Sequence, residues 1–306
     1  MRAVVQTEFG GPEVLRLVEA ARPVPGPGEV LVRVRASGVN PADAIVRRGD
    51  FPSFGTPPFT VGWDVSGEVE EVGPDAGYAV GDEVYGMPAF PAAASAYAEH
   101  VAARADELAP KPARLDHVHA AALPMAALTA WQALSRAGLA AGQRVLVHGA
   151  AGGVGHLVVQ IAKALGAHVT ALAGASGHEF VRGLGADEVV DYRATDFTTV
   201  LSGLDVVFDS VRQSDRSLTV LRPGGVLVTV NEQHDQALAE RVVAAGRRFE
   251  GLTVAPDRAG LEAITDLVDR GLVRPHVSRT FPLADVAAAH ELVESGHTRG
   301  KIVLVV

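Results

Sequence analysis

A glycine-rich run between an apolar segment and a helix-like segment constrains the fold of this chain more than any other feature. The run His148-Gly149-Ala150-Ala151-Gly152-Gly153-Val154-Gly155 follows the apolar residues Arg144–Val147 and leads into Leu157–Leu165. Strand, glycine loop and helix in this order are the context of a dinucleotide-binding fingerprint. Small residues let the backbone approach a pyrophosphate, and the helix N-terminus offers free N–H groups to it. Ala150 replaces the usual first glycine, and a plain tight turn is the alternative interpretation.

The residues around this loop alternate between strand-like and helix-like patterns. Val154, Leu157, Val158, Ile161 and Leu165 share one helix face that can pack on a sheet. The patterns predict strands at 143–149, 168–173, 188–191, 204–209, 225–230 and 249–254, and helices at 154–165, 178–184, 214–221 and 235–245. Such an alternation is typical of an α/β fold with a doubly wound parallel sheet.

The residues before and after this α/β region have a different texture. Residues 1 to about 115 read as short strands separated by Gly and Pro, with a half-buried strand over Glu29–Arg35, and indicate a barrel-like sheet. An Ala-rich helix over His119–Leu134 is expected to begin or break at Pro124. Residues 258–306 predict two amphipathic helices and a last strand, Lys301–Val306, that joins the N-terminal sheet.

Composition excludes several function classes. The net charge is −9, and Lys and Arg are not clustered, which argues against nucleic-acid partners and anionic membranes. The chain has no cysteine, so disulfides, thiolate nucleophiles and sulfur-based zinc sites are excluded. We see no signal-peptide pattern and no apolar window of 18 residues, so no membrane partner is expected and the cytoplasm is the expected location.

The end of the second predicted strand bears on which dinucleotide binds. Folds that prefer NAD usually place an Asp or Glu there to bind the ribose 2′-hydroxyl. Here the strand 168–173 runs into Gly174-Ala175-Ser176-Gly177-His178, with no carboxylate. Ser176 and His178, with Tyr192 or Arg193 nearby, suit a 2′-phosphate, so NADPH is the expected cofactor. The alternative is that Ser176 and His178 only start a helix.

Several ordered segments resemble the medium-chain dehydrogenase/reductase superfamily, in particular its zinc-free quinone oxidoreductase branch, which includes zeta-crystallin. The matching segments are 36–43, 62–67, 80–86, 122–131, 149–155, 184–192 and 300–304. The resemblance covers nearly the whole chain. It implies a GroES-like catalytic domain (1–117 and 257–306) interrupted by a Rossmann domain (118–256), with the active site in the cleft between them. It also implies a homodimer.

Zinc-containing members differ from this sequence where their metal ligands lie. By the resemblance, their catalytic Cys falls near Asn40-Pro41, their His-Glu pair near Trp63-Asp64 and their four-Cys lobe between about 85 and 100. This chain has no Cys at these places. His117 and His119 are expected to lie on the surface or to cap a helix. No metal site is therefore expected.

The resemblance also implies roles for individual residues. Asn40 matches the family's cleft asparagine, whose amide polarises a carbonyl or orients the nicotinamide; an Asn chosen for the turn before Pro41 is the alternative. Asp43 is expected to be structural. Ile45 stands where many quinone reductases have a Tyr, and this difference argues against a proton donor at that position. Phe51, Phe54 and Trp63 either wall a flat substrate or pack in the core.

The implied cofactor contacts lie along the whole chain. Thr129 matches a position near the nicotinamide or phosphates, and a solvent-facing helix residue is the alternative. The backbones of Gly152, Gly153 and Val154 are expected at the pyrophosphate, Tyr192 near the adenosine phosphate or packed in the interior, and Val211 at the nicotinamide. Lys301 either reaches the cofactor or is a solvated edge residue. The expected cofactor-binding residues are Asn40, Thr129, Gly152, Gly153, Val154, Ser176, His178, Tyr192, Val211 and Lys301.

The absence of metal ligands restricts the class of substrate that the protein is expected to reduce. Reducing a simple ketone leaves an alkoxide, which needs zinc or a proton donor for stabilisation. A quinone or an activated enone accepts hydride more readily, because the charge spreads over a hydroquinonate or an enolate. We therefore expect an NADPH-dependent quinone oxidoreductase. An enone or enoyl reductase of a biosynthetic pathway and an NADP-binding protein with little turnover are the alternatives.

Overall fold

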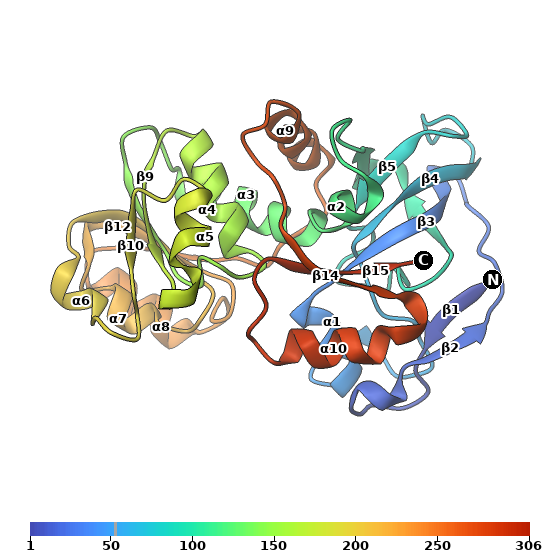
Figure 1. Ribbon diagram of the computed structural model, residues 1–306, viewed down its shortest axis with the longest axis horizontal. Helices are drawn as coiled ribbons and strands as arrows, with labels where there is room; N and C mark the ends of the chain where they lie inside the picture. Colours follow the sequence, from blue (N-terminus) through green and yellow to red (C-terminus); the bar gives the residue numbers. More distant parts are fainter. Residues whose placement is uncertain (52–53) are drawn as a thin grey trace. The chain divides into compact units, whose positions relative to one another are not determined.

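The computed structural model describes residues 1–51 and 54–306, which form two compact units (Figure 1). The first unit contains Met1–Leu128, Ala255–Asp269 and Pro275–Val306. The second contains Thr129–Val254 and Arg270–Arg274. The chain passes from the first unit to the second after Leu128, returns after Val254 and enters the second unit once more over Arg270–Arg274.

The second unit is the predicted doubly wound α/β sheet. Its strands are β8 (Arg144–Val147), β9 (His168–Leu172), β10 (Glu188–Val190), β11 (Leu204–Asp209), β12 (Leu221–Thr229) and β13 (Arg248–Gly251). They run parallel in the order β10-β9-β8-β11-β12-β13. The order reverses beside β8, which is where open α/β sheets bind ligands at the carboxyl ends of their strands.

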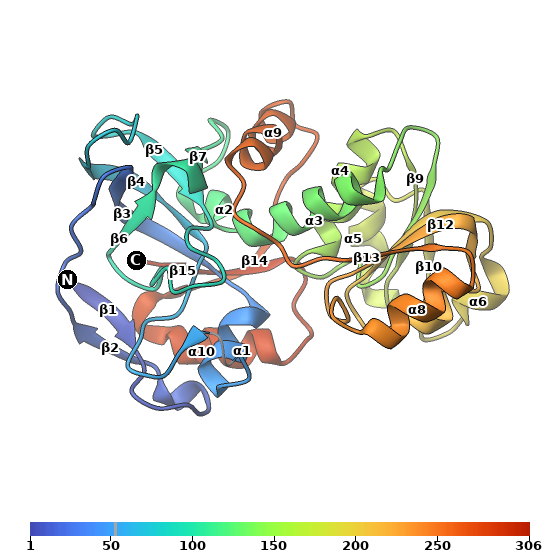
Figure 2. The same ribbon diagram turned by 180° about the vertical axis from the view of Figure 1, so that it is seen from behind.

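Helices cover both faces of this sheet (Figure 1, Figure 2). They are α4 (Gly155–Ala164), α5 (His178–Gly183), α6 (Phe197–Val200), α7 (Ser214–Ser217) and α8 (Gln236–Ala244). Apolar side chains from β8, β11 and β12, such as Leu146, Val207 and Leu227, form a fully buried core with Leu238 and Val242 of α8. This packing fixes the carboxyl ends of the strands, and with them the glycine loop.

Several predictions for this unit were wrong in extent. The strand predicted over 249–254 ends at Gly251. The helix predicted over 214–221 ends at Ser217, and the strand predicted over 225–230 begins already at Leu221. Leu221 is buried and pairs with Leu204 at the start of β11, so sheet pairing extends the strand toward its N-terminus. The sequence pattern also missed the short helix α6.

The first unit is built on antiparallel strands around the long strand β3 (Glu29–Val39). Its other strands are β1 (Arg2–Val5), β2 (Arg16–Glu19), β4 (Val65–Val72), β5 (Glu83–Gly86), β6 (His100–Arg104), β7 (Leu108–Pro110), β14 (Val277–Pro282) and β15 (Lys301–Val305). The main sheet has the order β14-β15-β3-β4-β5-β7, and β6 also pairs with β3. The last strand, β15, joins β3 antiparallel over 36–39, as predicted.

Three features of this unit differ from the expectations. The strand predicted over Glu29–Arg35 extends to Val39, because its last residues pair with β15. Leu31 lies on the same face of this half-buried strand as Arg33 and Arg35, yet it is fully buried. Strand β14, which pairs with β15, was not predicted.

The helices of the first unit are α1 (Pro41–Arg48), α2 (His117–Ala121), α9 (Arg258–Asp269) and α10 (Val286–Glu294). Helix α3 (Pro124–Ala137) begins here and continues into the second unit, and Pro124 is its first residue, as predicted. Asp116 caps α2 by accepting the backbone N–H of His119. Both predicted helices of 258–306 are present as α9 and α10.

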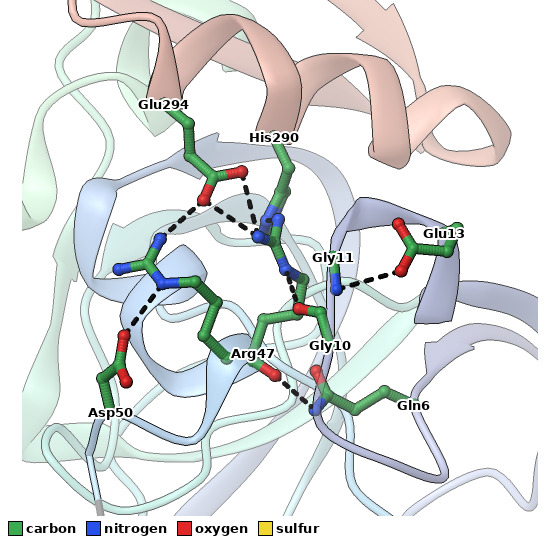
Figure 3. A network of polar contacts seen from close by, with 9 residues as sticks. Gln6, Gly10, Gly11, Glu13, Arg47, Asp50, His290 and Glu294 are labelled. Carbon is green, nitrogen blue, oxygen red and sulfur yellow. Dashed lines mark hydrogen bonds and ion pairs between the residues drawn. The ribbon is translucent and has the colours of Figure 1, made fainter.

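A buried arginine fastens α1 to α10 (Figure 3). Arg47 is 1% exposed, and its Nη2 donates to both carboxylate oxygens of Glu294 at 2.9 Å. Its Nε donates to the Gly10 carbonyl at 3.1 Å, and its Nη1 lies 3.1 Å from Nδ1 of His290. Burial and the nearby Arg47 lower the pKa of His290 to about 3, so this imidazole is neutral and accepts from the guanidinium.

Replacing Arg47 tests how strongly this contact holds α1. We expect Arg47→Met to lower the free energy of unfolding by about 3–5 kcal/mol, because removing one partner leaves buried polar groups unpaired. Arg48 also binds Glu294, at 2.5 Å, but it is 40% exposed. Arg48→Met should therefore cost less than about 1 kcal/mol. Urea denaturation of both variants measures the two losses, and equal losses would contradict this assignment.

Candidate functional site

Asn40 lies at the junction between β3 and α1. It is the N-cap of α1, Pro41 is the first helical residue, and the Asn40 backbone N–H donates to Oδ2 of Asp43 at 2.7 Å. An acid at the third helical position that accepts the N-cap N–H is one half of a capping box, and Pro suits the first position because its missing N–H is not needed there. This local geometry fixes the backbone of Asn40, which is 3% exposed.

The side chain of Asn40 takes part in a buried polar cluster rather than a simple turn. Its Nδ2 donates to Oδ2 of Asp64 at 2.9 Å, and its Oδ1 accepts from Nζ of Lys301. Nζ of Lys301 also lies 3.3 Å from Oδ2 of Asp64. The amide is thereby oriented on both sides, with its oxygen toward the cation and its nitrogen toward the anion.

Asp64 and Lys301 are themselves enclosed. Lys301 is 4% exposed and Asp64 is fully buried, so Lys301 is not the solvated edge residue that the sequence left open. The second carboxylate oxygen of Asp64 accepts the backbone N–H of Met125 at 2.8 Å. Burial raises the pKa of Asp64, while the charge of Lys301 and the bond from Asn40 act in the opposite direction.

Asp43 is the second buried acid of this region. Its Oδ2 accepts from the backbone of Asn40 and from the hydroxyl of Tyr97, the latter at 2.8 Å. Its Oδ1 is buried without a hydrogen-bond partner in the part of the chain that the structure describes. Burial raises the pKa of Asp43 to about 7, although both hydrogen bonds act to lower it. The carboxyl therefore gains and loses its proton near neutral pH.

The aromatic candidates pack mainly against one another. Trp63 is 1% exposed, meets Phe54 and Phe90 edge-on at 5.6 and 5.0 Å, and donates its Nε1–H to the Ala92 carbonyl at 2.7 Å. Phe54 also contacts Phe59. Of the two alternatives for Trp63, packing in the core fits its burial better than lining a substrate pocket. Ile45, by contrast, is 37% exposed on α1.

The glycine loop of the second unit is a tight turn that opens into α4. Gly149 has φ +59°, a conformation that favours glycine. A Cβ at Gly155 would lie 2.1 Å from the carbonyl oxygen of Gly149, so a side chain there would force the loop apart. Gly153 and Val154 donate to no backbone carbonyl in the hydrogen bonds of the described residues. Free N–H groups at the start of a ten-residue helix suit an anionic phosphate.

The turn after β9 lies against this loop. A Cβ at Gly177 would be 3.4 Å from that of Ala151, which brings the segment of Ser176 and His178 beside the glycine loop. Ser176 is exposed, while Nε2 of His178 donates to the Ala173 carbonyl at 3.2 Å. This nitrogen of His178 therefore binds a nearby backbone carbonyl within the same turn.

A cation lies next to the same turn. A Cβ at Gly174 would be 3.6 Å from Nε of Arg193, so glycine leaves room for this side chain. The Arg193 guanidinium lies 5.5 Å from the centre of the Tyr192 ring, and its Nε donates to the Tyr192 hydroxyl at 3.3 Å. Tyr192 is 53% exposed, so the alternative of interior packing is wrong. An exposed Ser, Tyr and Arg at the acid-free end of β9 fit a 2′-phosphate.

Val211 lies beside the glycine loop as well. It follows β11, is 46% exposed, and its Cγ1 would be 3.2 Å from a Cβ at Gly149. The buried carboxylate of Asp209 shapes this turn by accepting the backbone N–H groups of Val211 and Gln213 at 2.8 and 2.6 Å. Arg212, between them, adopts φ +59°.

The structure brings the predicted residues together in two groups. Asn40 meets Lys301 in the first unit. The glycine loop, the Ser176–His178 turn and Val211 adjoin one another in the second. Thr129 is buried in α3, so the solvent-facing alternative for this residue is wrong. Sequence reasoning missed Asp64 and Tyr97. The sequence offered a signal for Asp64, because the metal-ligand pair of zinc-containing relatives falls near Trp63-Asp64. Tyr97 lies in an irregular segment without any motif.

The histidines of α2 bind partners other than a metal. His117 lies 2.8 Å from the Ser66 hydroxyl and 3.1 Å from Glu83, and His119 lies 2.7 Å from Asp116. Within the described ranges, 1–51 and 54–306, no three His, Cys, Asp or Glu side chains gather as metal ligands would. Helices in these ranges are too short or too polar to cross a bilayer.

Comparisons with known proteins agree with this geometry. Residues 26–113 match the model of the alcohol dehydrogenase GroES-like domain, and residues 184–304 match that of a zinc-binding dehydrogenase. The chain is 36% identical to the NADPH-dependent alkenal/one oxidoreductase of Arabidopsis thaliana, over 99% of this chain and 79% of the relative. It is 32% identical to the human quinone oxidoreductase, over 99% and 97%.

Solved structures with similar folds include two quinone oxidoreductases. That of Coxiella burnetii superposes with a TM-score of 0.92 at 36% identity, covering 100% of this chain and 99% of the other. That of Escherichia coli, solved with NADPH, gives 0.89 at 28% identity, with both chains fully covered.

The pKa of Asp43 leads to a testable pH dependence of stability. Between about pH 4 and 7 the unfolded chain has lost this proton and the folded chain still holds it. The wild type should therefore lose stability as the pH rises through this window, by at most about 1.4 kcal/mol per pH unit. Asp43→Asn lacks this contribution.

We expect the difference in unfolding free energy, variant minus wild type, to increase from pH 4 to pH 7. Urea denaturation at half-unit pH steps measures it. A difference that stays constant across the window would show that Asp43 is ionised throughout.

Proposed function

Since this chain belongs to the zinc-free quinone oxidoreductase branch of the medium-chain dehydrogenase/reductase superfamily, we propose that it transfers hydride from NADPH to a quinone without the help of zinc. Its relatives show it to be an NAD(P)H-dependent oxidoreductase of the quinone and alkenal type. We propose the cofactor form, the acceptor and the metal independence.

The absence of a carboxylate at the end of β9 is the main reason to propose NADPH as the cofactor. Arg193 lies next to Gly174 and 5.5 Å from the centre of the Tyr192 ring, so a cation and a hydroxyl lie at the end of β9. In dinucleotide-binding folds this strand end contacts the ribose 2′-substituent, which supports the choice of NADPH. The glycine loop and the start of α4 supply the N–H groups for the pyrophosphate. In this proposal Gly152, Gly153, Val154, Ser176, Tyr192 and Val211 contact the cofactor, His178 shapes the turn, and Thr129 keeps its predicted place near the nicotinamide.

The Asn40 cluster supports metal independence. The oxygens of Asn40 and Asp64 that a cation would need are already bound to the ammonium of Lys301. With no cysteine in the chain, a sulfur-ligated zinc has no ligands. In this proposal the Lys301 ammonium and the Asn40 amide are fixed hydrogen-bond donors, and preorganised donors of this kind stabilise a developing oxyanion. We assign Lys301 and Asn40 to this role.

Bound NADPH supplies the hydride, and the acceptor also needs a proton. The balanced reaction is quinone + NADPH + H⁺ → hydroquinone + NADP⁺. The chain's own contribution is to hold the cofactor through the loop and to keep the Asn40 amide and the Lys301 ammonium in one orientation. A second candidate acceptor is an activated enone, because relatives of similar identity are an alkenal/one oxidoreductase and a tomato 2-methylene-furan-3-one reductase. The expected homodimer and the cytoplasmic location stay predictions.

An acceptor panel tests the proposed reaction. Purified protein is mixed with NADPH and with benzoquinone, phenanthrenequinone or an alkyl enone, and NADPH oxidation is followed at 340 nm. We expect turnover with the quinones that survives treatment with a zinc chelator. Turnover with the enone alone would favour the second candidate. NADPH binding without oxidation of any acceptor would leave a binding protein, and the proposed activity would be wrong.

Replacing Arg193 tests the cofactor form. We expect Arg193→Met to raise the KM for NADPH about tenfold or more and to leave that for NADH unchanged, because it removes a hydrogen bond to a charged phosphate. Arg222 is a matched exposed arginine whose partner is Asp205 near the start of β11, away from the carboxyl ends of the strands. Arg222→Met should change neither KM. An equal rise in the KM values for NADPH and NADH in Arg193→Met would contradict the 2′-phosphate assignment.

A further inference from the structure

A line of buried side chains connects the Arg47 contact with Asn40. The His290 ring, held by Arg47 (Figure 3), meets the ring of Tyr97 edge-on, with 5.8 Å between ring centres and an angle of 84°. The Tyr97 hydroxyl donates to Asp43, which accepts the backbone N–H of Asn40. These contacts link helix α10 to Asn40, which accepts a hydrogen bond from Lys301.

Tyr97 is fixed from several sides. It is fully buried, and a Cβ at Gly62 would lie only 2.4 Å from its ring. Gly62 also has φ +98°, so glycine is required there both for backbone conformation and for close packing. The backbone N–H of Tyr97 donates to the Val61 carbonyl, and its carbonyl accepts the N–H of Val4. The hydroxyl therefore has one well-defined direction, toward Asp43.

The two oxygens of Asp43 differ. Oδ2 accepts two hydrogen bonds, while the buried Oδ1 accepts none among the described residues. A proton on Oδ1 would leave both contacts of Oδ2 in place. The charged and titratable groups around Asp43 are Asp64 before β4, Lys301 of β15, Tyr97, Arg47 of α1 and His290 of α10. His290 is neutral and the pKa of Tyr97 is raised well above its usual 10, mainly by burial, so neither changes charge near neutrality.

We propose that Tyr97 and Asp43 are positioning residues of the reductase, which hold Asn40 in place for Lys301 and do so most firmly when Asp43 has released its proton from Oδ1. The proposal rests on the proposed function, since it is Asn40 that would act on the cofactor or the acceptor. A carboxylate accepts the Asn40 N–H about twice as strongly as a neutral carboxyl. The rate of hydride transfer should therefore rise with pH through the titration of Asp43.

Tyr97→Phe separates positioning from simple packing. The variant keeps the ring and removes only the hydroxyl, whose hydrogen bond is one of the two that lower the pKa of Asp43. We expect kcat at pH 7 to fall about tenfold, the acidic limb of the kcat profile to move to higher pH, and the KM for NADPH to change less than twofold. Tyr85→Phe is the matched control, because Tyr85 is equally buried and donates to the Leu261 carbonyl at 2.7 Å, outside this line. It should leave kcat and its pH profile unchanged.

A second measurement does not depend on turnover. In ¹⁵N-labelled protein the backbone amide of Asn40 donates to Asp43, so its chemical shifts should titrate with an apparent pKa near 7. Asp43→Asn, which is isosteric, should abolish this titration, remove the acidic limb of the kcat profile and keep kcat at the low level of the protonated enzyme.

The outcomes separate the two proposals. If no acceptor is reduced by the wild type, the proposed function fails, and the Asn40 titration alone decides the positioning of its backbone. The positioning role is overturned if the Asn40 amide does not titrate, if it still titrates in Asp43→Asn, or if Tyr97→Phe keeps the wild-type pH profile. Should Tyr97→Phe fail to fold, the comparison of the Asn40 titration in the wild type and in Asp43→Asn decides between these outcomes.

Discussion

The buried contact among Asn40, Asp64 and Lys301 is the interaction on which the first unit's site depends. It joins the end of β3, the residue before β4 and the start of the last strand, which are far apart in the sequence. Separately, each of these polar groups would be costly to bury; together they satisfy one another. Strand β15 pairs with β3 over 36–39, so the sheet itself carries Lys301 to Asn40. The C-terminal segment is thus a structural requirement of the site.

This arrangement supports the proposal of a reaction that does not depend on sulfur ligands. The Lys301 side chain contacts an amide and a carboxylate at the centre of the cluster, and no cysteine is available for a metal. Such a cluster is fixed before any substrate arrives, which is the property that electrostatic stabilisation of an oxyanion needs. In the second unit, the glycine loop, the turn after β9 and Val211 form a backbone-lined surface suited to phosphates. The two units thus carry complementary parts of one proposed reductase.

Particular residues show how far the sequence could lead. The glycine loop and the alternating pattern identified the parallel sheet, because backbone conformation and burial leave local traces in the sequence. Asn40-Pro41-Ala42-Asp43 likewise has the spacing of a helix start. The end of the predicted helix 214–221 was wrong because Leu221 pairs with Leu204 in the neighbouring strand, a contact that no local pattern records. Tyr97 was missed for the same reason.

The sequence by itself determined the fold class, the glycine loop between strand and helix and the absence of thiolate ligands, since these depend on residue type and short spacing. Only the tertiary structure decided that Lys301 is buried against Asn40 and Asp64, that Asp43 has one unpartnered oxygen among the described residues and a pKa of about 7, and that Arg193 lies beside Gly174. The physical reason is that hydrogen-bond partners and desolvation depend on which distant segments the sheets bring together. The pKa and the hydrogen bonds of a charged side chain are therefore set by those neighbours.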